Sequence, residues 1–237
     1  MFKRLIALPF VGLALIAAAK PAPAPVTPPP SLIAPATIAA DPANRWTLEL
    51  SNGGRVVIQL RPDLAPQHVY RIQQLTSQGF YNGLPFHRVI PGFMAQGGDP
   101  LGTGEGGSKL PDLPAEFTTI PHVRGVASMA RAEDKNSANS QFFIMLAPRF
   151  SLDRKYTAFG RVIEGMAGVD GIAVGEPPEQ PTRIVKASIG GPLPAPPAVA
   201  PAAASAPAAP AVATPEPAPA PAATAAPATA AEAPAPQ

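Results

Sequence analysis

LPFHRVIPGFMAQGGDP, residues 84–100, carries the clearest structural signal in the sequence. It predicts two short strands joined by a tight turn, because Pro91-Gly92 is a typical turn pair. Before the turn, Phe86, Arg88 and every second residue share one face, as in a half-buried strand. A charge on that face is costly unless it is paired. The stretch ends in Gly97-Gly98, where the backbone can come close to another segment of chain.

A second stretch, VASMARAEDKNSANSQFFIML at residues 126–146, also predicts two strands with a connection between them. Its two ends, residues 126–129 and 141–146, are apolar enough to be buried strands. Residues 131–140 between them are polar and predict an exposed loop. The pattern therefore places two more strands in the same sheet.

The remaining apolar segments predict mostly strands. Residues 46–50 and 55–60 alternate around Asn52-Gly53-Gly54, which is typical of a hairpin. Residues 66–78 change to helical spacing, with a proline in the first turn and Gly79 after the last. Further strands are expected at residues 156–163 and 182–189, and a short helix or turn at 165–172. Many short strands with few helices favour a mainly β fold, a closed antiparallel barrel.

The two stretches together resemble the cyclophilin family of peptidyl-prolyl cis/trans isomerases. The resemblance covers roughly residues 46–189, and the matching segments are Phe86–Asp99, Ser128–Ala130, Asn139–Ile144 and Phe159-Gly160. It implies a closed eight-stranded antiparallel β-barrel with one helix capping each end, here residues 66–78 and 165–172. It also implies that the chain is an isomerase of X–Pro peptide bonds.

The ends of the chain have a different composition. Residues 1–19 carry Lys3 and Arg4, an apolar run and an Ala-Ala-Ala end, which predicts a secretory signal peptide. The alternative is an uncleaved membrane anchor, although the run is short for a bilayer span. Residues 20–42 and 191–237 are rich in Ala and Pro and predict a linker and a disordered tail of extended spacer segments. The isomerase domain is thus expected at residues 43–190.

Charge and cysteine content exclude several classes. The chain has 18 Lys and Arg against 16 Asp and Glu, and two of the 18 lie in the predicted leader. The mature chain is then neutral, which gives no electrostatic reason to expect nucleic acid binding. The absence of cysteine rules out disulfides and thiol chemistry. After leader cleavage no stable membrane insertion is expected.

The reaction itself sets the kind of site to look for. Rotation about an X–Pro bond must overcome a barrier of about 18–20 kcal/mol, and no covalent bond is made or broken. It needs no nucleophile, metal or cofactor. It needs a fixed donor for the twisted amide, whose nitrogen becomes a better acceptor, and an apolar pocket for the proline ring.

Arg88 is the expected donor, since a guanidinium offers a rigid fork and stays protonated. The resemblance supports this role and assigns Gln96 as the residue that buttresses it. From the residues alone, a salt bridge inside the barrel is an equally good interpretation of Arg88. The resemblance implies that the substrate is contacted by a further set of residues, of which Ala130 and Arg131 act through their main chains: Phe93, Met94, Ala130, Arg131, Gln141, Phe143, Leu152 and Tyr156.

The sequence gives little support for a metal site or for a serine hydrolase. His68, His87 and His122 do not have metal-ligand spacing, so no metal site is expected. Ser128 does not lie in a Gly-x-Ser-x-Gly sequence, which argues against a serine hydrolase.

The sequence therefore predicts a monomeric periplasmic isomerase that assists the folding of exported, proline-containing polypeptides. A different class of function is a proline-binding chaperone module with little turnover, which would need the pocket but not the donor. A third is a spacer protein of the cell envelope with no affinity for proline peptides. The Ala-Pro tail, residues 191–237, could also occupy the site itself.

Overall fold

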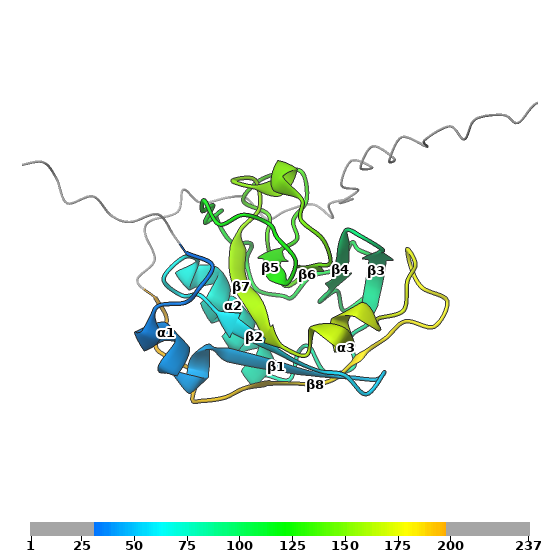
Figure 1. Ribbon diagram of the computed structural model, residues 1–237, viewed down its shortest axis with the longest axis horizontal. Coiled ribbons are helices and arrows are strands. Elements are labelled where there is room, and N and C mark those ends of the chain that lie inside the picture. Colours follow the sequence, from blue (N-terminus) through cyan, green and yellow to red (C-terminus); the bar gives the residue numbers. More distant parts are fainter. Residues whose placement is uncertain (1–30, 198–237) are drawn as a thin grey trace, which may run out of the picture.

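The computed structural model describes residues 31–197, which form an eight-stranded antiparallel sheet in the order β3-β4-β6-β5-β7-β2-β1-β8 (Figure 1). All strands lie where the sequence predicts them, to within two residues at either end, and they are β1 Arg45–Leu50, β2 Arg55–Leu60, β3 Phe86–Ile90, β4 Met94–Gly97, β5 Val126–Met129, β6 Phe142–Met145, β7 Ala158–Glu164 and β8 Ile184–Ile189. The predicted leader lies outside the described residues, as does most of the predicted tail.

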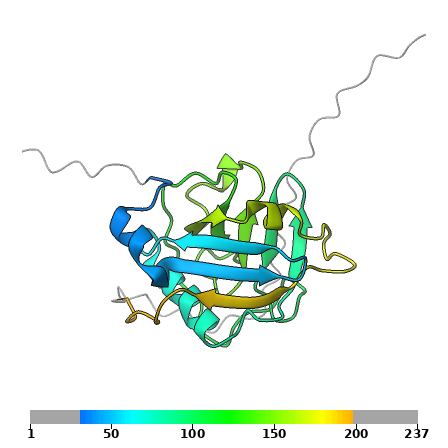
Figure 2. The ribbon, with the colours of Figure 1, turned by 60° about the horizontal axis from the view of Figure 1, so that its bottom comes forward.

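The sheet curls so that its two edge strands approach each other. Strands β1, β2 and β8 run side by side on one side of the molecule (Figure 2). Between the edge strands β3 and β8 there is one isolated bridge, Pro85 to Arg183, and Phe86 N donates to Thr182 O at 2.9 Å. The contact is local rather than a continuous ladder, so a fully closed barrel stays a prediction.

The main hydrophobic core fills the space inside the curled sheet. Trp46 is fully buried at its centre, with ring centroids 5.2 Å from Tyr81 and 4.9 Å from Phe142. Both predicted helices, α2 Pro66–Ser77 and α3 Met166–Asp170, add apolar side chains to this core, which are Val69, Ile72, Leu75 and Val169. Aromatic burial of this extent is a large part of the stability of a domain without disulfides.

The close approach predicted at Gly97-Gly98 is confirmed. Gly98 has φ +85°, and a Cβ at this position would lie 2.5 Å from the carbonyl oxygen of Ser140. Ser140 Oγ also donates to Gly98 O at 2.8 Å. Only glycine fits here, because both the backbone conformation and the space exclude a side chain.

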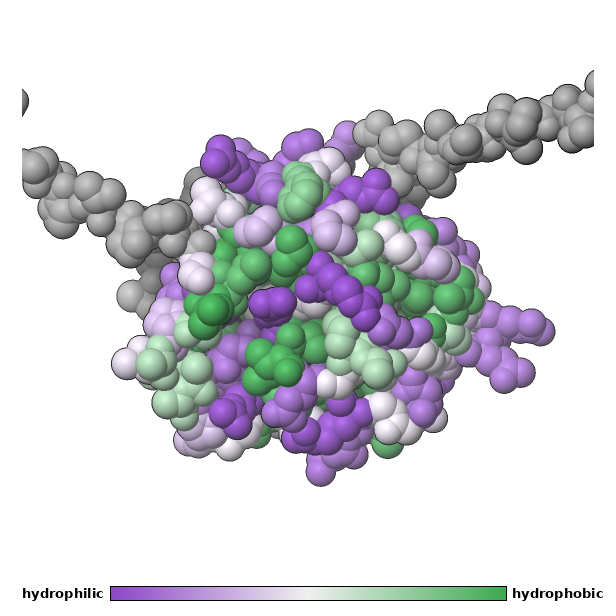
Figure 3. All heavy atoms as spheres, in the orientation of Figure 1, coloured by the Kyte–Doolittle hydropathy of each residue, from purple (hydrophilic) through white to green (hydrophobic). Residues whose placement is uncertain are grey.

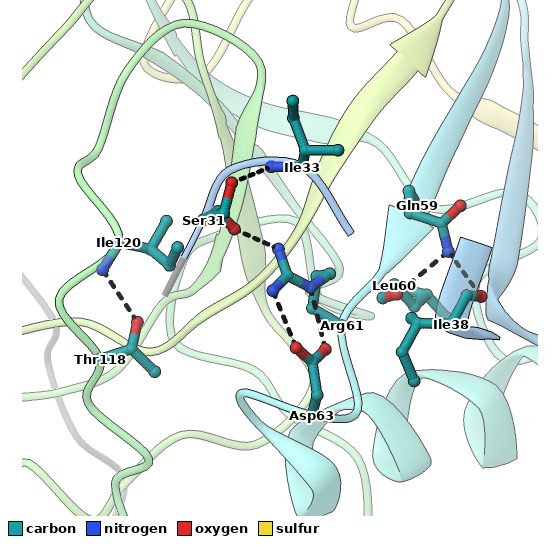
Figure 4. Close-up of polar contacts among 9 residues, drawn as sticks. All are labelled: Ser31, Ile33, Ile38, Gln59, Leu60, Arg61, Asp63, Thr118 and Ile120. Carbon is teal, nitrogen blue, oxygen red and sulfur yellow. Dashed lines mark hydrogen bonds and ion pairs between the residues drawn. The ribbon is translucent and has the colours of Figure 1, made fainter. Parts of the chain in front are cut away.

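Residues 31–42, which the sequence places in the linker, are folded against the domain. They contain helix α1 Ala36–Ala40 and lead into a 3-10 turn, Pro42–Asn44. Arg61 binds Asp63 through two hydrogen bonds and donates to Ser31 O at 2.6 Å (Figure 4). The folded part of the chain therefore begins before residue 43.

Within residues 31–197 no helix is long and apolar enough to cross a membrane. In the same range no group of three or more His, Cys, Asp or Glu side chains is placed to hold a metal ion.

Candidate functional site

A row of directly paired residues crosses four neighbouring strands. Arg88 on β3 pairs with Gln96 on β4, Gln96 pairs with Phe143 on β6, and Phe143 pairs with Ser128 on β5. Side chains of directly opposite residues in a sheet point to the same face. The sheet therefore brings the predicted donor, its predicted buttress and one predicted pocket residue onto one face.

The face that Arg88 occupies differs from the prediction. The register shifts between Phe86 and Arg88, so that one extra residue, His87, is inserted into β3. Phe86 and Val89 both enter the main core, whereas Ile90 packs with a second apolar cluster on the face of Arg88. The prediction that Phe86 and Arg88 share a face is wrong, because a bulge breaks the alternation of a strand.

Arg88 is paired, as a charge at this position requires. Its Nε donates to Glu176 Oε2 at 2.6 Å, and its side chain is 19% exposed. Glu176 lies in the segment between α3 and β8, and no sequence signal connected it to Arg88. The terminal Nη groups of Arg88 have no hydrogen-bond partner among residues 31–197.

Gln96 is held by a second glutamine. Its Nε2 donates to Gln141 Oε1 at 2.8 Å, and Gln141 Nε2 donates to the carbonyls of Gly104 and Gly106, each at 2.8 Å. The amide of Gln141 is thereby fixed between β4 and the glycine-rich loop. The structure gives the Gln96 side chain no hydrogen bond to Arg88 among the described residues, so the buttressing role stays a prediction.

The glycine-rich loop is organised by one buried carboxylate. Asp99 accepts from the backbone of Leu101, Thr103 and Gly104 at 2.6–2.9 Å. Burial opposes ionisation, but these hydrogen bonds outweigh it and hold the pKa of Asp99 below its usual value. The loop is therefore a fixed support for Gln141 and not a phosphate cradle, because its N–H groups already bind a carboxylate.

The second apolar cluster collects the remaining predicted pocket residues. Its buried members include Met94 and Phe143, and the partly buried residues packed against it include Phe93, Ala130, Leu152 and Tyr156. Tyr156 meets Phe143 edge to face at 5.6 Å between ring centroids. Arg149 lies over the ring of Phe93 at 5.0 Å. Residues from four separate parts of the sequence thus pack into one contiguous apolar cluster.

The side chain of Arg131 makes structural contacts at the edge of the cluster. Its guanidinium lies 4.8 Å from the centre of the Tyr156 ring and donates to the carbonyls of Ala132, Glu133 and Lys155. The N–H of Ala130 donates to Gln141 O at 3.0 Å, so only its carbonyl remains for a ligand. The side chain of Arg131 pins two loops at the edge of the cluster.

Ser128, His122 and Asp153 form a buried chain of hydrogen bonds that the sequence did not indicate. His122 Nε2 is 2.9 Å from Ser128 Oγ, and His122 Nδ1 is 2.9 Å from Asp153 Oδ1. Burial lowers the pKa of His122, although Asp153 opposes this. A neutral ring then donates from Nδ1 and accepts at Nε2, and the ring stacks on Phe143 at 6.3 Å. Ser128 is fully buried, so the chain supports Phe143 and cannot present a nucleophile.

A cavity of about 490 Å³ lies between the N-terminal segment and strands β2 and β7. It is lined by residues that include Ile33, Gln59, Arg61 and Ile163, and by none of the predicted site residues. Hydrophobic residues also gather in the middle of the face seen in Figure 3, on both sides of a hydrophilic band. The cavity adjoins the second apolar cluster, since five of its lining residues also belong to that cluster: Leu32, Leu64, Ile120, Val126 and Ala158.

The chain matches known proteins along this whole domain. The family model described as cyclophilin type peptidyl-prolyl cis-trans isomerase/CLD matches residues 45–189. A probable peptidyl-prolyl cis-trans isomerase of Brucella suis is 49% identical over 167 residues, which are 64% of this chain and 85% of the relative. Peptidyl-prolyl cis-trans isomerase B of Bacillus subtilis is 43% identical over 119 residues, or 49% of this chain and 82% of the relative.

Solved structures show the same similarity. The cyclophilin AquaCyp293 of Hirschia baltica is 33% identical with a TM-score of 0.58, and the match covers 63% of this chain and 74% of that one. A Cryptosporidium parvum cyclophilin, crystallised in the presence of the dipeptide Ala-Pro, is 27% identical with a TM-score of 0.58, covering 62% and 99%. The resemblance found in the sequence is thus confirmed, and the chain belongs to the cyclophilin-type peptidyl-prolyl cis-trans isomerases.

Proposed function

We propose that Arg88 supplies the donor for the twisted X–Pro amide and that the second apolar cluster holds the proline ring. The row of paired residues from Arg88 through Gln96 to Phe143 is the observation that supports this most strongly. Two strand spacings separate Arg88 from Phe143, which is about 10 Å of backbone. An extended dipeptide covers about 7 Å of this distance, and the long Arg88 side chain covers the rest, with the proline ring on Phe143 and the carbonyl near the Nη groups of Arg88.

The energetics fit a site of this kind. Uncatalysed isomerisation takes tens to hundreds of seconds, so a turnover in about a millisecond requires a gain of roughly 10⁵-fold. That gain corresponds to about 7 kcal/mol. A fixed, charged donor that meets the twisted amide better than either planar form contributes several kcal/mol, and immobilising the ring adds the rest.

The substrates we infer are X–Pro bonds in exported polypeptides whose folding the enzyme assists. The Ala-Pro dipeptide in the crystals of the Cryptosporidium relative supports the substrate class. The sequence of residues 1–19 supports a periplasmic location, where we infer that the enzyme acts as a monomer. The Pro85–Arg183 bridge supports a closed barrel as the rigid frame of the site.

Exchange NMR on a short Ala-Pro peptide tests the proposal. The full chain, added in catalytic amount, is expected to accelerate exchange between the cis and trans peptide signals. Shifts of the protein signals without faster exchange would contradict the proposed mechanism and favour the proline-binding module. Faster exchange that persists when the apolar cluster is disrupted would contradict the assignment of the pocket.

A further inference from the structure

The contact between Arg88 and Glu176 joins two segments that are 88 positions apart in the chain. The Nε–Oε2 distance is 2.6 Å, and the Glu176 side chain is 51% exposed while that of Arg88 is mostly covered. Charge-assisted hydrogen bonds of this length are the stronger kind. Glu176 therefore holds one defined edge of the guanidinium while its own outer side faces solvent.

The backbone fixes Glu176 beside Arg88. Gly175, the residue before Glu176, exchanges two hydrogen bonds with Val89, the residue after Arg88, at 2.8 and 3.1 Å. At the other end of the same segment, Thr182 O accepts from Phe86 N at 2.9 Å. The segment from Gly175 to Thr182 is thus anchored to β3 at both of its ends. The Glu176 carboxylate is therefore held next to the strand that carries Arg88.

Because of the geometry of a guanidinium, the contact with Glu176 determines how the Arg88 side chain is oriented. The group is planar and presents five N–H bonds in a fixed fork. A hydrogen bond at Nε sets the rotation of the plane without using the Nη groups, and those groups have no partner among the described residues. A preorganised donor costs no rearrangement when charge develops in the transition state.

We propose that Glu176 is the positioning residue for Arg88: it fixes the plane of the guanidinium so that the Nη groups face the X–Pro bond. This inference rests on the proposed role of Arg88. Glu176 acts through Arg88 and does not itself touch the substrate. The opposite role, a carboxylate that competes with the substrate for Arg88, is a distinct outcome of the test.

Substitution of Glu176 separates these roles. Glu176→Ala removes the acceptor, and kcat is expected to fall about tenfold with KM changed less than about twofold, because small misplacements of a reacting group are costly. Glu176→Gln keeps a neutral acceptor at the same place and is expected to recover part of that loss. The Nε–H signal of Arg88 in NMR spectra should shift in the alanine variant and less in the glutamine variant.

Two controls match the change in charge. Glu164→Gln breaks the exposed ion pair with Arg55, and Glu179→Gln removes a carboxylate from the same segment as Glu176. Both are expected to leave kcat and KM unchanged. Equal effects of Glu176→Gln and Glu179→Gln would overturn the proposal, since they would indicate a general effect of charge.

The Arg88→Ala variant separates this inference from the proposed function. If Glu176 acts only through Arg88, Glu176→Ala has no further effect in the Arg88→Ala background. A tenfold loss that persists in that background would overturn the positioning role, as would a rise in kcat/KM in Glu176→Ala alone. If Arg88→Ala itself leaves catalysis intact, the proposed function fails; if Arg88→Ala abolishes it and Glu176→Ala does not lower it, only this inference fails.

Discussion

The rings of Phe143 and Tyr156 meet edge to face, with their centroids 5.6 Å apart and their planes at 82°. On another side Phe143 stacks on His122. Because both neighbours restrict the Phe143 ring, the surface proposed to receive proline is shaped before any ligand binds. Preorganised surfaces lose less entropy on binding.

Removing the Tyr156 ring should weaken peptide binding. Tyr156→Ala is expected to raise the Kd for an Ala-Pro peptide about tenfold, since an aromatic contact contributes about 1 kcal/mol beyond its buried area. Titration of the peptide followed by NMR measures the effect. Val185→Ala, at an exposed position of β8, is the control. Unchanged affinity in Tyr156→Ala would place the proline site elsewhere.

The ion pair between the buried Arg61 and Asp63 should be important for stability. The side chains are 6% and 29% exposed, so Asp63→Ala leaves a guanidinium largely buried without its partner. We expect a loss of about 2 kcal/mol in the free energy of unfolding, measured with urea. The matched change Asp170→Ala breaks a half-exposed pair with Arg124 and should cost less than about 1 kcal/mol. Equal losses would show that burial of Arg61 has no energetic consequence.

Stability should fall in mildly acidic solution. Burial lowers the pKa of His87 and of His122 below the usual value of about 6.5. Below that value the unfolded chain binds protons that the folded chain does not, so the free energy of unfolding decreases as the pH falls. Urea unfolding at pH 7.5 and 5.5 measures the decrease.

A variant without these two rings tests the assignment. His87→Asn with His122→Asn should be less stable at pH 7.5, yet its stability should change less between the two pH values. A pH dependence as steep as that of the unmodified chain would assign it to other groups.

The strands were predictable because alternation and turn residues act locally. The hairpin of β1 and β2 and the helix at residues 66–77 are determined by residues that lie close together in the sequence. The bulge at His87 was not predictable in this way. One inserted residue leaves the local composition unchanged but moves Arg88 to the face opposite Phe86, and only the pairing with β4 determines where the insertion occurs.

The candidate site was predictable only in part. The resemblance supplied the predicted contact residues, and the structure brings most of them onto one apolar cluster. It could not supply Glu176, because the carboxylate lies in a proline-rich segment with no strand or helix pattern. Likewise Ser128 on β5 meets His122, which precedes β5, and Asp153, which follows β6, only when these segments are packed together. Partners of this kind depend on tertiary structure alone.

Exchange NMR on the full chain with Arg88→Ala measures whether Arg88 lowers the barrier to rotation. Catalysed cis/trans exchange of an Ala-Pro peptide is expected to fall at least about 100-fold in this variant, the usual cost of removing one donor to a transition state. Peptide affinity should change by less than about threefold, since the apolar cluster remains. Exchange as fast as that of the unmodified chain would show that Arg88 is not the donor.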